Sequence, residues 1–136
     1  MLSQVLPRRS LGLAALALPL ALVGCDTNDA PSTACDLSAT VAASAVPVTA
    51  TYRASTTGRA TVETLTYRTA TGVETVRRPS LPWQAVVTLG PGIVPSVSAG
   101  GRAIDGELAL RVSAAGQSGG TTVTLDGVDT CAFGQR

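Results

Sequence analysis

The chain has 136 residues and a formal net charge of +1 at pH 7, a near-neutral balance that offers no basic surface for nucleic acid. It contains no histidine, so the commonest general base and the commonest metal ligand are both absent. One Trp, one Phe and two Tyr are its only aromatic residues, so a core must be built mainly from Val, Leu, Ile and Ala.

The first element in chain order is an apolar segment near the N-terminus. Arg8-Arg9 precede an apolar run at residues 11–23, which ends in a Leu-Val-Gly-Cys motif at Cys25. This order is typical of a secretory signal peptide, and the run is shorter than the roughly 20 apolar residues of a spanning helix. The motif resembles a bacterial lipobox, which predicts a signal peptide at residues 1–24 and lipid attachment at Cys25. The alternatives are an ordinary thiol at Cys25 and a twin-arginine signal.

Cleavage before Cys25 would leave about 110 residues, enough for one small domain. These hold eight arginines and nine acids, a formal charge of −1. Residues 25–34 are mostly Asp, Thr, Asn, Ser, Pro and Ala, which predicts a lipidated N-terminus and a short tether. We therefore expect an exported protein that is anchored by lipid to a bacterial membrane, on its periplasmic or outer face. Asp26 favours inner-membrane retention in some sorting systems, but the leaflet stays open.

Two cysteines remain once Cys25 carries lipid. In an exported domain, Cys35 and Cys131 are expected to form a disulfide. The bond would close a loop that contains nearly the whole domain, which we place at residues 35–136. The alternative is a pair of free thiols in a reducing compartment.

Short runs with period-two alternation and β-branched residues follow the tether and indicate strands. The expected strands occupy residues 46–53, 61–68, 73–77, 83–89, 93–98, 104–113, 121–125 and 128–133. The expected turns and breaks lie at Gly58, Thr71-Gly72, Gly90-Pro91-Gly92, Gly100-Gly101, residues 116–120 and Asp126-Gly127, the last as a two-residue type I′ hairpin turn. Val62 departs from the parity of Leu65 and Tyr67, which predicts a bulge or a shifted strand start.

No segment after residue 30 combines a helical repeat with helix caps. Six to eight short strands with frequent turn signals predict an all-β domain, a small antiparallel β-sandwich. A small closed barrel is the alternative architecture.

Four segments in the middle of the chain carry a family resemblance: Val-Thr-Ala-Thr-Tyr at residues 48–52, Leu-Thr-Tyr at 65–67, Ser-Leu-Pro-Trp at 80–83 and the short strand after it. In these segments the chain resembles the MmpS family, small accessory proteins of MmpL/RND-type exporters. The resemblance spans residues 46–131 and implies an immunoglobulin-like or transthyretin-like sandwich and a transporter as partner. Two features depart from the family: a lipobox replaces its usual transmembrane helix, and the strand at residues 107–112 has no cysteine.

Arg77, Arg78 and Trp83 form the expected interaction surface. Arg77-Arg78 carry two charges for an anionic partner, although adjacent strand residues point to opposite faces, and a solvated edge is the simpler interpretation. Trp83 follows Pro82 and either faces a ligand or packs in the core.

The paired acidic residues are expected to be solvated surface charges rather than catalytic or metal-binding groups. Asp105 with Glu107, and Asp126 with Asp129, have the spacing of paired carboxylates but no acidic glycine-rich loop. No histidine is present to activate a serine nucleophile, and no phosphate-binding loop occurs. We therefore expect no catalytic, metal or cofactor site, and a non-enzymatic envelope lipoprotein that acts as a binding or accessory module of a transport complex. The alternative is a structural or adhesion-type surface lipoprotein without a defined ligand.

Overall fold

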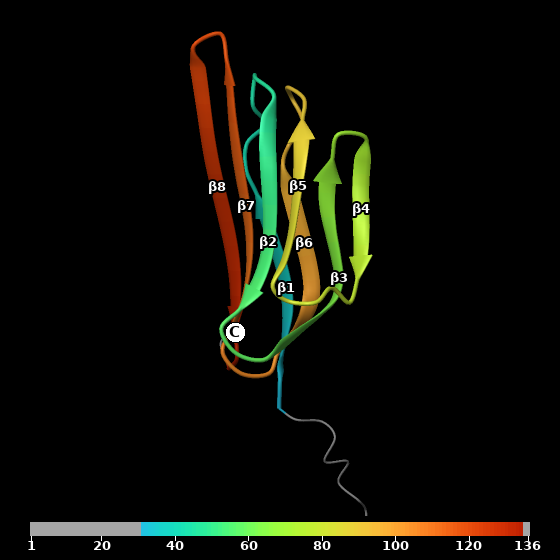
Figure 1. Cartoon of the computed structure of the whole chain (residues 1–136). Helices are drawn as coiled ribbons and strands as arrows, with labels where there is room; N and C mark the ends of the chain where they lie inside the picture. Colours follow the sequence, from blue (N-terminus) through green and yellow to red (C-terminus); the bar gives the residue numbers. More distant parts are fainter. Residues whose placement is uncertain (1–30, 135–136) are drawn as a thin grey trace, which may run out of the picture.

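The computed structural model describes residues 31–134, which contain strands and no helix. Eight antiparallel strands form two four-stranded sheets that pack together (Figure 1). The first sheet has the order β1-β6-β3-β4, formed by β1 (Thr33–Thr40), β6 (Ser96–Ala103), β3 (Ala60–Thr69) and β4 (Gly72–Arg77). The second has the order β5-β2-β7-β8, formed by β5 (Trp83–Leu89), β2 (Val48–Thr56), β7 (Glu107–Ser118) and β8 (Thr121–Ala132). The predicted antiparallel β-sandwich is confirmed, as two separate sheets rather than one closed barrel.

The core lies between the sheets and follows the alternation in the sequence. On β7, Leu108, Leu110 and Val112 are buried while the residues between them point outward. The other buried apolar residues of the core are Cys35, Leu37, Ala39, Val41, Val48, Ala50, Tyr52, Ala54, Val62, Leu65, Leu89, Val97, Ala99, Ala103 and Ala114. Most of these are Ala or Val, so small and medium-sized side chains predominate in number between the sheets.

Three aromatic rings form a row from the core to the side of the sandwich where β4 and β5 lie. The ring centroids of Tyr52 and Tyr67 are 5.4 Å apart, and those of Tyr67 and Trp83 are 5.3 Å apart. The buried Tyr52 hydroxyl donates to the carbonyl oxygen of Arg68 at 2.8 Å, and burial raises the pKa of Tyr52. The Tyr67 hydroxyl donates to Glu74 at 2.6 Å, and this hydrogen bond raises the pKa of Tyr67.

The opposite side of the sandwich is closed where β1 lies beside β8. The disulfide between Cys35 and Cys131 joins these strands, with their Cα atoms 5.8 Å apart. The Asp129 carboxylate also accepts a hydrogen bond from the backbone N–H of Ser38 at 2.9 Å, on the edge of β1 that β6 does not use. The predicted pairing of the two cysteines is therefore present, and a side chain helps to cover the free edge of β1.

The predicted turn at Asp126-Gly127 is wrong. Strand β8 runs without interruption through both residues, and Gly127 pairs with Val112 of β7. The hairpin turn lies instead at Gly119-Gly120, where φ is +56° and +80°, so the predicted loop at residues 116–120 is shorter than expected. Glycine at position 127 avoids a tight contact, because a Cβ there would lie 3.0 Å from the carbonyl oxygen of Thr40.

The predicted end of a strand at Gly100-Gly101 is also wrong, because β6 begins at Ser96 and continues through both glycines to Ala103. A Cβ on Gly101 would overlap the carbonyl oxygen of Thr61 on β3, so the strands approach too closely there for any side chain.

Two further findings concern β1 and β3. The sequence pattern does not indicate β1, which starts at Thr33, two residues before the expected domain boundary. The register between β3 and β6 shifts between Val62 and Thr64, which confirms the expected bulge.

Candidate functional site

The connection between β4 and β5, residues 78–82, lies between two hollows. The first, which we call the loop hollow, has a volume of about 630 Å³ and lies between this connection, the start of β3 and the β2–β3 loop. The second, which we call the sheet hollow, has a volume of about 480 Å³ and lies over the outer face of the second sheet. Both volumes fall in the range of small-molecule sites, roughly 300–1,000 Å³.

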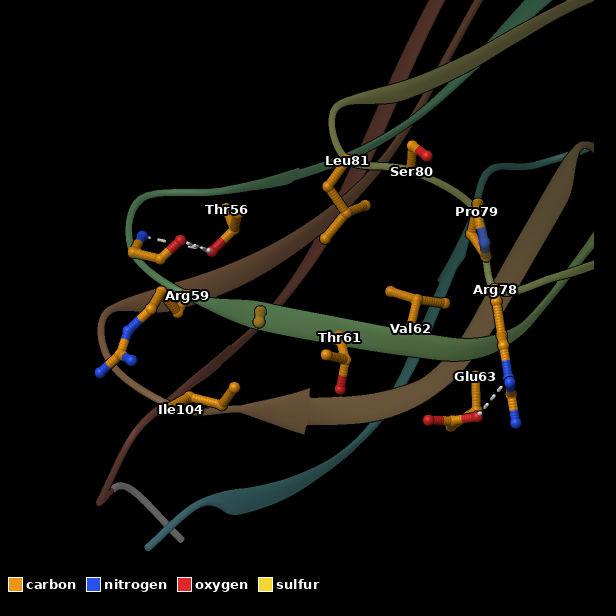
Figure 2. Close-up of a pocket in the computed structure, with 12 residues that line it drawn as sticks. Thr56, Arg59, Thr61, Val62, Glu63, Arg78, Pro79, Ser80, Leu81 and Ile104 are labelled. Atoms are coloured by element: carbon orange, nitrogen blue, oxygen red, sulfur yellow. Dashed lines mark hydrogen bonds and ion pairs between the residues drawn. The ribbon is translucent and has the colours of Figure 1, made fainter. Parts of the chain in front are cut away.

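The loop hollow combines apolar side chains with one ion pair. Leu81 of the connection and Val62 of β3 point toward each other across it (Figure 2). Arg78 leaves the strand geometry with φ +49°, and its backbone N–H donates to the carbonyl oxygen of Glu63 at 3.0 Å. The Arg78 Nε lies 3.5 Å from a carboxylate oxygen of Glu63, so most of the charge at this border is balanced within the chain.

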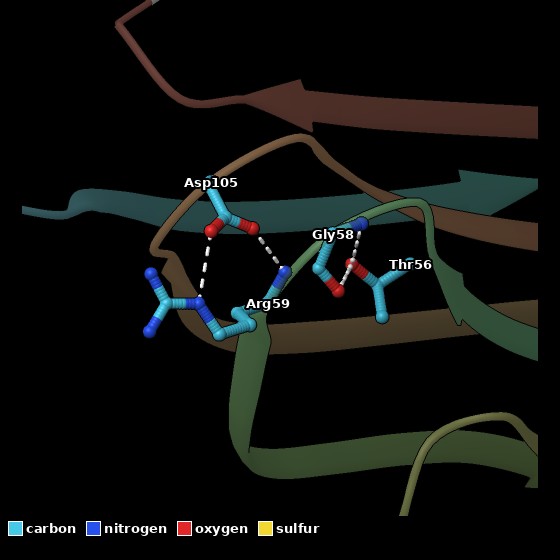
Figure 3. Close-up of polar contacts among 4 residues, drawn as sticks. All are labelled: Thr56, Gly58, Arg59 and Asp105. Atoms are coloured by element: carbon cyan, nitrogen blue, oxygen red, sulfur yellow. Dashed lines mark hydrogen bonds and ion pairs between the residues drawn. The ribbon is translucent and has the colours of Figure 1, made fainter.

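The loops beside this hollow are held together by Asp105. Its carboxylate accepts hydrogen bonds from the backbone N–H and from the Nε of Arg59, the latter at 2.9 Å (Figure 3). The backbone N–H bond of Arg59, followed by its side-chain bond, holds the pKa of Asp105 below its usual value. Thr56 adds a local turn, because its hydroxyl bonds with both the N–H and the C=O of Gly58. A Cβ on Gly106, which has φ +72°, would lie 2.8 Å from the Gly58 nitrogen, so the two loops require glycine at this contact.

The sheet hollow contains two arginines on adjacent strands. Arg53 of β2 and Arg111 of β7 lie directly opposite each other in the ladder and point outward. Arg111 binds both carboxylate oxygens of Asp126, at 3.1 and 2.9 Å, and this pairing lowers the pKa of Asp126. The Arg53 Nε donates to the side-chain oxygen of Gln84 at 3.0 Å.

The expected interaction surface is divided by the structure. Arg77 is the exposed last residue of β4 and pairs with Thr64, whereas Arg78 turns away toward the loop hollow. Trp83 is half-buried: it packs on Tyr67 in the aromatic row and also borders the sheet hollow. The three residues therefore do not form one clamp, and Trp83 packs against the core while it also borders the sheet hollow.

Sequence reasoning missed Arg53 and Arg111. Each stands at an outward position of its own strand, but only the pairing of β2 with β7 brings them together, and no local signal gives that register. Of the acids that the sequence singled out, Asp105, Asp126 and Asp129 all bind groups of the domain itself.

Within residues 31–134, no three His, Cys, Asp or Glu side chains gather in an arrangement that holds a metal ion. The same stretch contains no helix of the length and apolar character needed to cross a membrane. The lipid-attachment residue Cys25 lies outside the described part of the chain. Comparison with models of protein families, with curated proteins and with solved structures finds no match to this chain.

Proposed function

We propose that this chain is an exported bacterial lipoprotein, held at a membrane through Cys25, whose β-sandwich is a non-enzymatic binding module. The observation that carries the proposal is the position of the loop hollow. The residues that line this hollow come largely from the β2–β3 loop and the β4–β5 connection. Both segments lie at the end of the sandwich at which β1 begins (Figure 1). A lipid on the preceding residues would therefore hold the hollow toward the membrane.

Contacts at this end support that orientation. Thr33 at the start of β1 pairs with Ala103 at the end of β6. The loop that follows β6 contains Asp105, which binds Arg59 of the β2–β3 loop. Arg59 in turn lines the loop hollow. The start of the domain and the hollow are thus linked through adjacent, hydrogen-bonded loops.

The length of the tether limits the distance to the membrane. Residues 26–32 separate Cys25 from β1 and span at most about 25 Å when fully extended. A domain confined in this way meets membrane partners at a high effective concentration. Even a contact of low intrinsic affinity can then be occupied. The partner that fits best is a membrane protein, and the MmpS resemblance favours a transporter of the RND type.

The anchor is tested with Cys25→Ala, using Thr27→Ala as a matched change within the same segment. We expect Cys25→Ala to move the protein from the membrane fraction to the soluble fraction and to abolish labelling by radioactive palmitate, while Thr27→Ala changes neither. Palmitate that still enters the Cys25→Ala protein would show that the lipid is attached elsewhere.

The binding role is tested in the same strains with a photoreactive residue at Ser80, which lines the loop hollow, or at Thr124, which is exposed on β8 away from it. We expect cross-linking to a membrane transporter from Ser80 only, and only when Cys25 is present. Equal products from both positions, or none from Ser80, would favour the structural or adhesion role instead.

A further inference from the structure

We propose that the sheet hollow binds a small organic monocarboxylate, with Arg53 as the anion-binding side chain. This site lies on the outer face of the second sheet, and its existence does not depend on the membrane anchor or on the partner of the loop hollow.

The hollow arises from small side chains in one row of the sheet. Ser55 of β2 and Ala109 of β7 are paired in the ladder and line it, two positions along their strands from the paired arginines. Pro82 lines it from the connection before β5, and Val128 from β8. Short side chains between longer neighbours leave a depression on a surface that would otherwise be flat.

The charges in the hollow are not balanced within the described domain. Like charges directly opposite each other in a ladder destabilise it, and Arg53 and Arg111 form such a pair. Asp126 compensates Arg111 through two hydrogen bonds. Arg53 forms no ion pair with any residue between 31 and 134, where the ion pairs involve Arg59, Arg78 and Arg111. One positive charge in the hollow is therefore available to an anion.

The hydrogen bond to Gln84 makes Arg53 a suitable receptor. It uses the Nε of Arg53 at 3.0 Å and restrains the guanidinium while leaving both terminal nitrogens without a partner in residues 31–134. Two parallel N–H groups of a guanidinium match the two oxygens of a carboxylate. A side chain that is already restrained loses less conformational entropy when it binds.

The apolar part of the hollow determines the rest of the ligand. Val128 has 61% of its surface exposed, although it is a β-branched apolar residue, and it lines the hollow together with Pro82 and the edge of Trp83. Removing such surface from water favours binding of an alkyl or aryl group. The hollow thus fits a carboxylate attached to a compact apolar body better than a bare anion or a neutral apolar molecule.

The test is a titration of the purified protein with phenylacetate, in which binding is measured by the NMR chemical-shift changes of backbone amides. The probe 2-phenylethanol keeps the apolar body without the charge, and inorganic phosphate supplies a charge without the body. We expect saturable shifts at residues 53–55, 109 and 128 with phenylacetate. The affinity should be at least about tenfold weaker with 2-phenylethanol, which loses the charge-assisted hydrogen bonds to Arg53, and with phosphate, which loses the burial of apolar surface.

Variants separate this site from general charge effects. Arg53→Gln should weaken phenylacetate binding about tenfold or more, and Ala109→Leu should abolish it by filling the hollow without changing charge. Arg77→Gln removes the same charge from an exposed strand position in the other sheet and should leave binding unchanged. The proposal is overturned if phenylacetate produces no saturable shifts, if 2-phenylethanol or phosphate binds equally well, or if Arg77→Gln weakens binding as much as Arg53→Gln.

Discussion

Removal of the Cys35–Cys131 disulfide should cost this domain a large part of its stability. The bond joins residues 96 positions apart, so it closes a loop that contains almost the whole domain. The chain-entropy relation assigns a loop of this length about 4.7 kcal/mol. The free energy of unfolding of a small domain is about 5–15 kcal/mol. A loss of 1 kcal/mol from it lowers the Tm of a domain of this size by about 4–8 °C. The double variant Cys35→Ala/Cys131→Ala should therefore melt about 20 °C lower, or more.

The assay is thermal and denaturant unfolding followed by circular dichroism. Alanine is chosen because Cys35 is buried, and a serine there would add the cost of a buried hydroxyl. The wild-type protein with reductant should resemble the double variant, and each single variant should lose a similar amount. Reductant should have no effect on the double variant. A decrease in Tm of less than about 5 °C in both the reduced protein and the double variant would refute the loop-closure reasoning.

Two further predictions concern packing and pH. Gly101→Ala should lower the free energy of unfolding by about 1–3 kcal/mol, because the new Cβ would overlap the backbone carbonyl oxygen of Thr61. Gly100→Ala, where nothing lies within 4 Å, is the control, and equal losses would contradict the packing argument. The hydrogen bonds to Asp105 and Asp126 lower both pKa values, so their stabilisation is complete above the unfolded-state pKa of about 4 and is lost as the pH falls through the folded-state values. The Tm should therefore fall below about pH 4, and a Tm that stays constant down to pH 2 would contradict this assignment.

The strands with large apolar residues could be predicted from sequence because burial imposes a visible period of two. The segments around Leu108, Leu110 and Val112 on β7, and around Tyr52 on β2, are examples. Strand β1 has the same alternation, but its inward residues include the small Ala39 and its outward ones include Asp36 and Ser38, so intrinsic strand preference is weak there. Its pairing with β6 stabilises it, and such long-range pairing is not encoded locally.

The error at Asp126-Gly127 has a different cause. Asp-Gly between two β-branched stretches is a strong hairpin signal when only neighbouring residues are considered. In the folded domain, the Asp126 carboxylate binds Arg111 on the neighbouring strand, and Gly127 leaves space for the backbone near Thr40. Both residues therefore have roles in tertiary packing, an ion pair for Asp126 and a close backbone approach for Gly127, and neither forms a turn.

Candidate site residues were harder to predict than the fold. Trp83 and Arg78 could be singled out because they are unusual residues beside prolines. Arg53 is an ordinary outward residue of a strand, and its importance depends on Arg111 and Gln84, which lie 58 and 31 positions away and become neighbours only through sheet register. A pattern read along the chain contains no information about which outward residues face each other.

The two sides of the sandwich also differ in what covers their edge strands. The side formed by β1 and β8 is closed by the disulfide and by the Asp129 carboxylate on the edge of β1. On the other side, β4 and β5 are edge strands of different sheets. There, β4 is short and carries the acidic Glu74, and the connection to β5 contains prolines, features that hinder edge-to-edge association.

Both hollows adjoin that connection, and the sheet hollow extends from it across the second sheet to Val128 of β8. Changes to exposed residues in them, such as Arg53 or Ser80, leave the disulfide and the buried core untouched. Such variants should therefore keep the wild-type Tm to within a few degrees, since exposed positions usually contribute less than about 0.5 kcal/mol to stability. A loss of binding in a variant that melts normally would then report on the hollow itself. A loss of binding with a large decrease in Tm would instead mean that these side chains are part of what holds the sheets together.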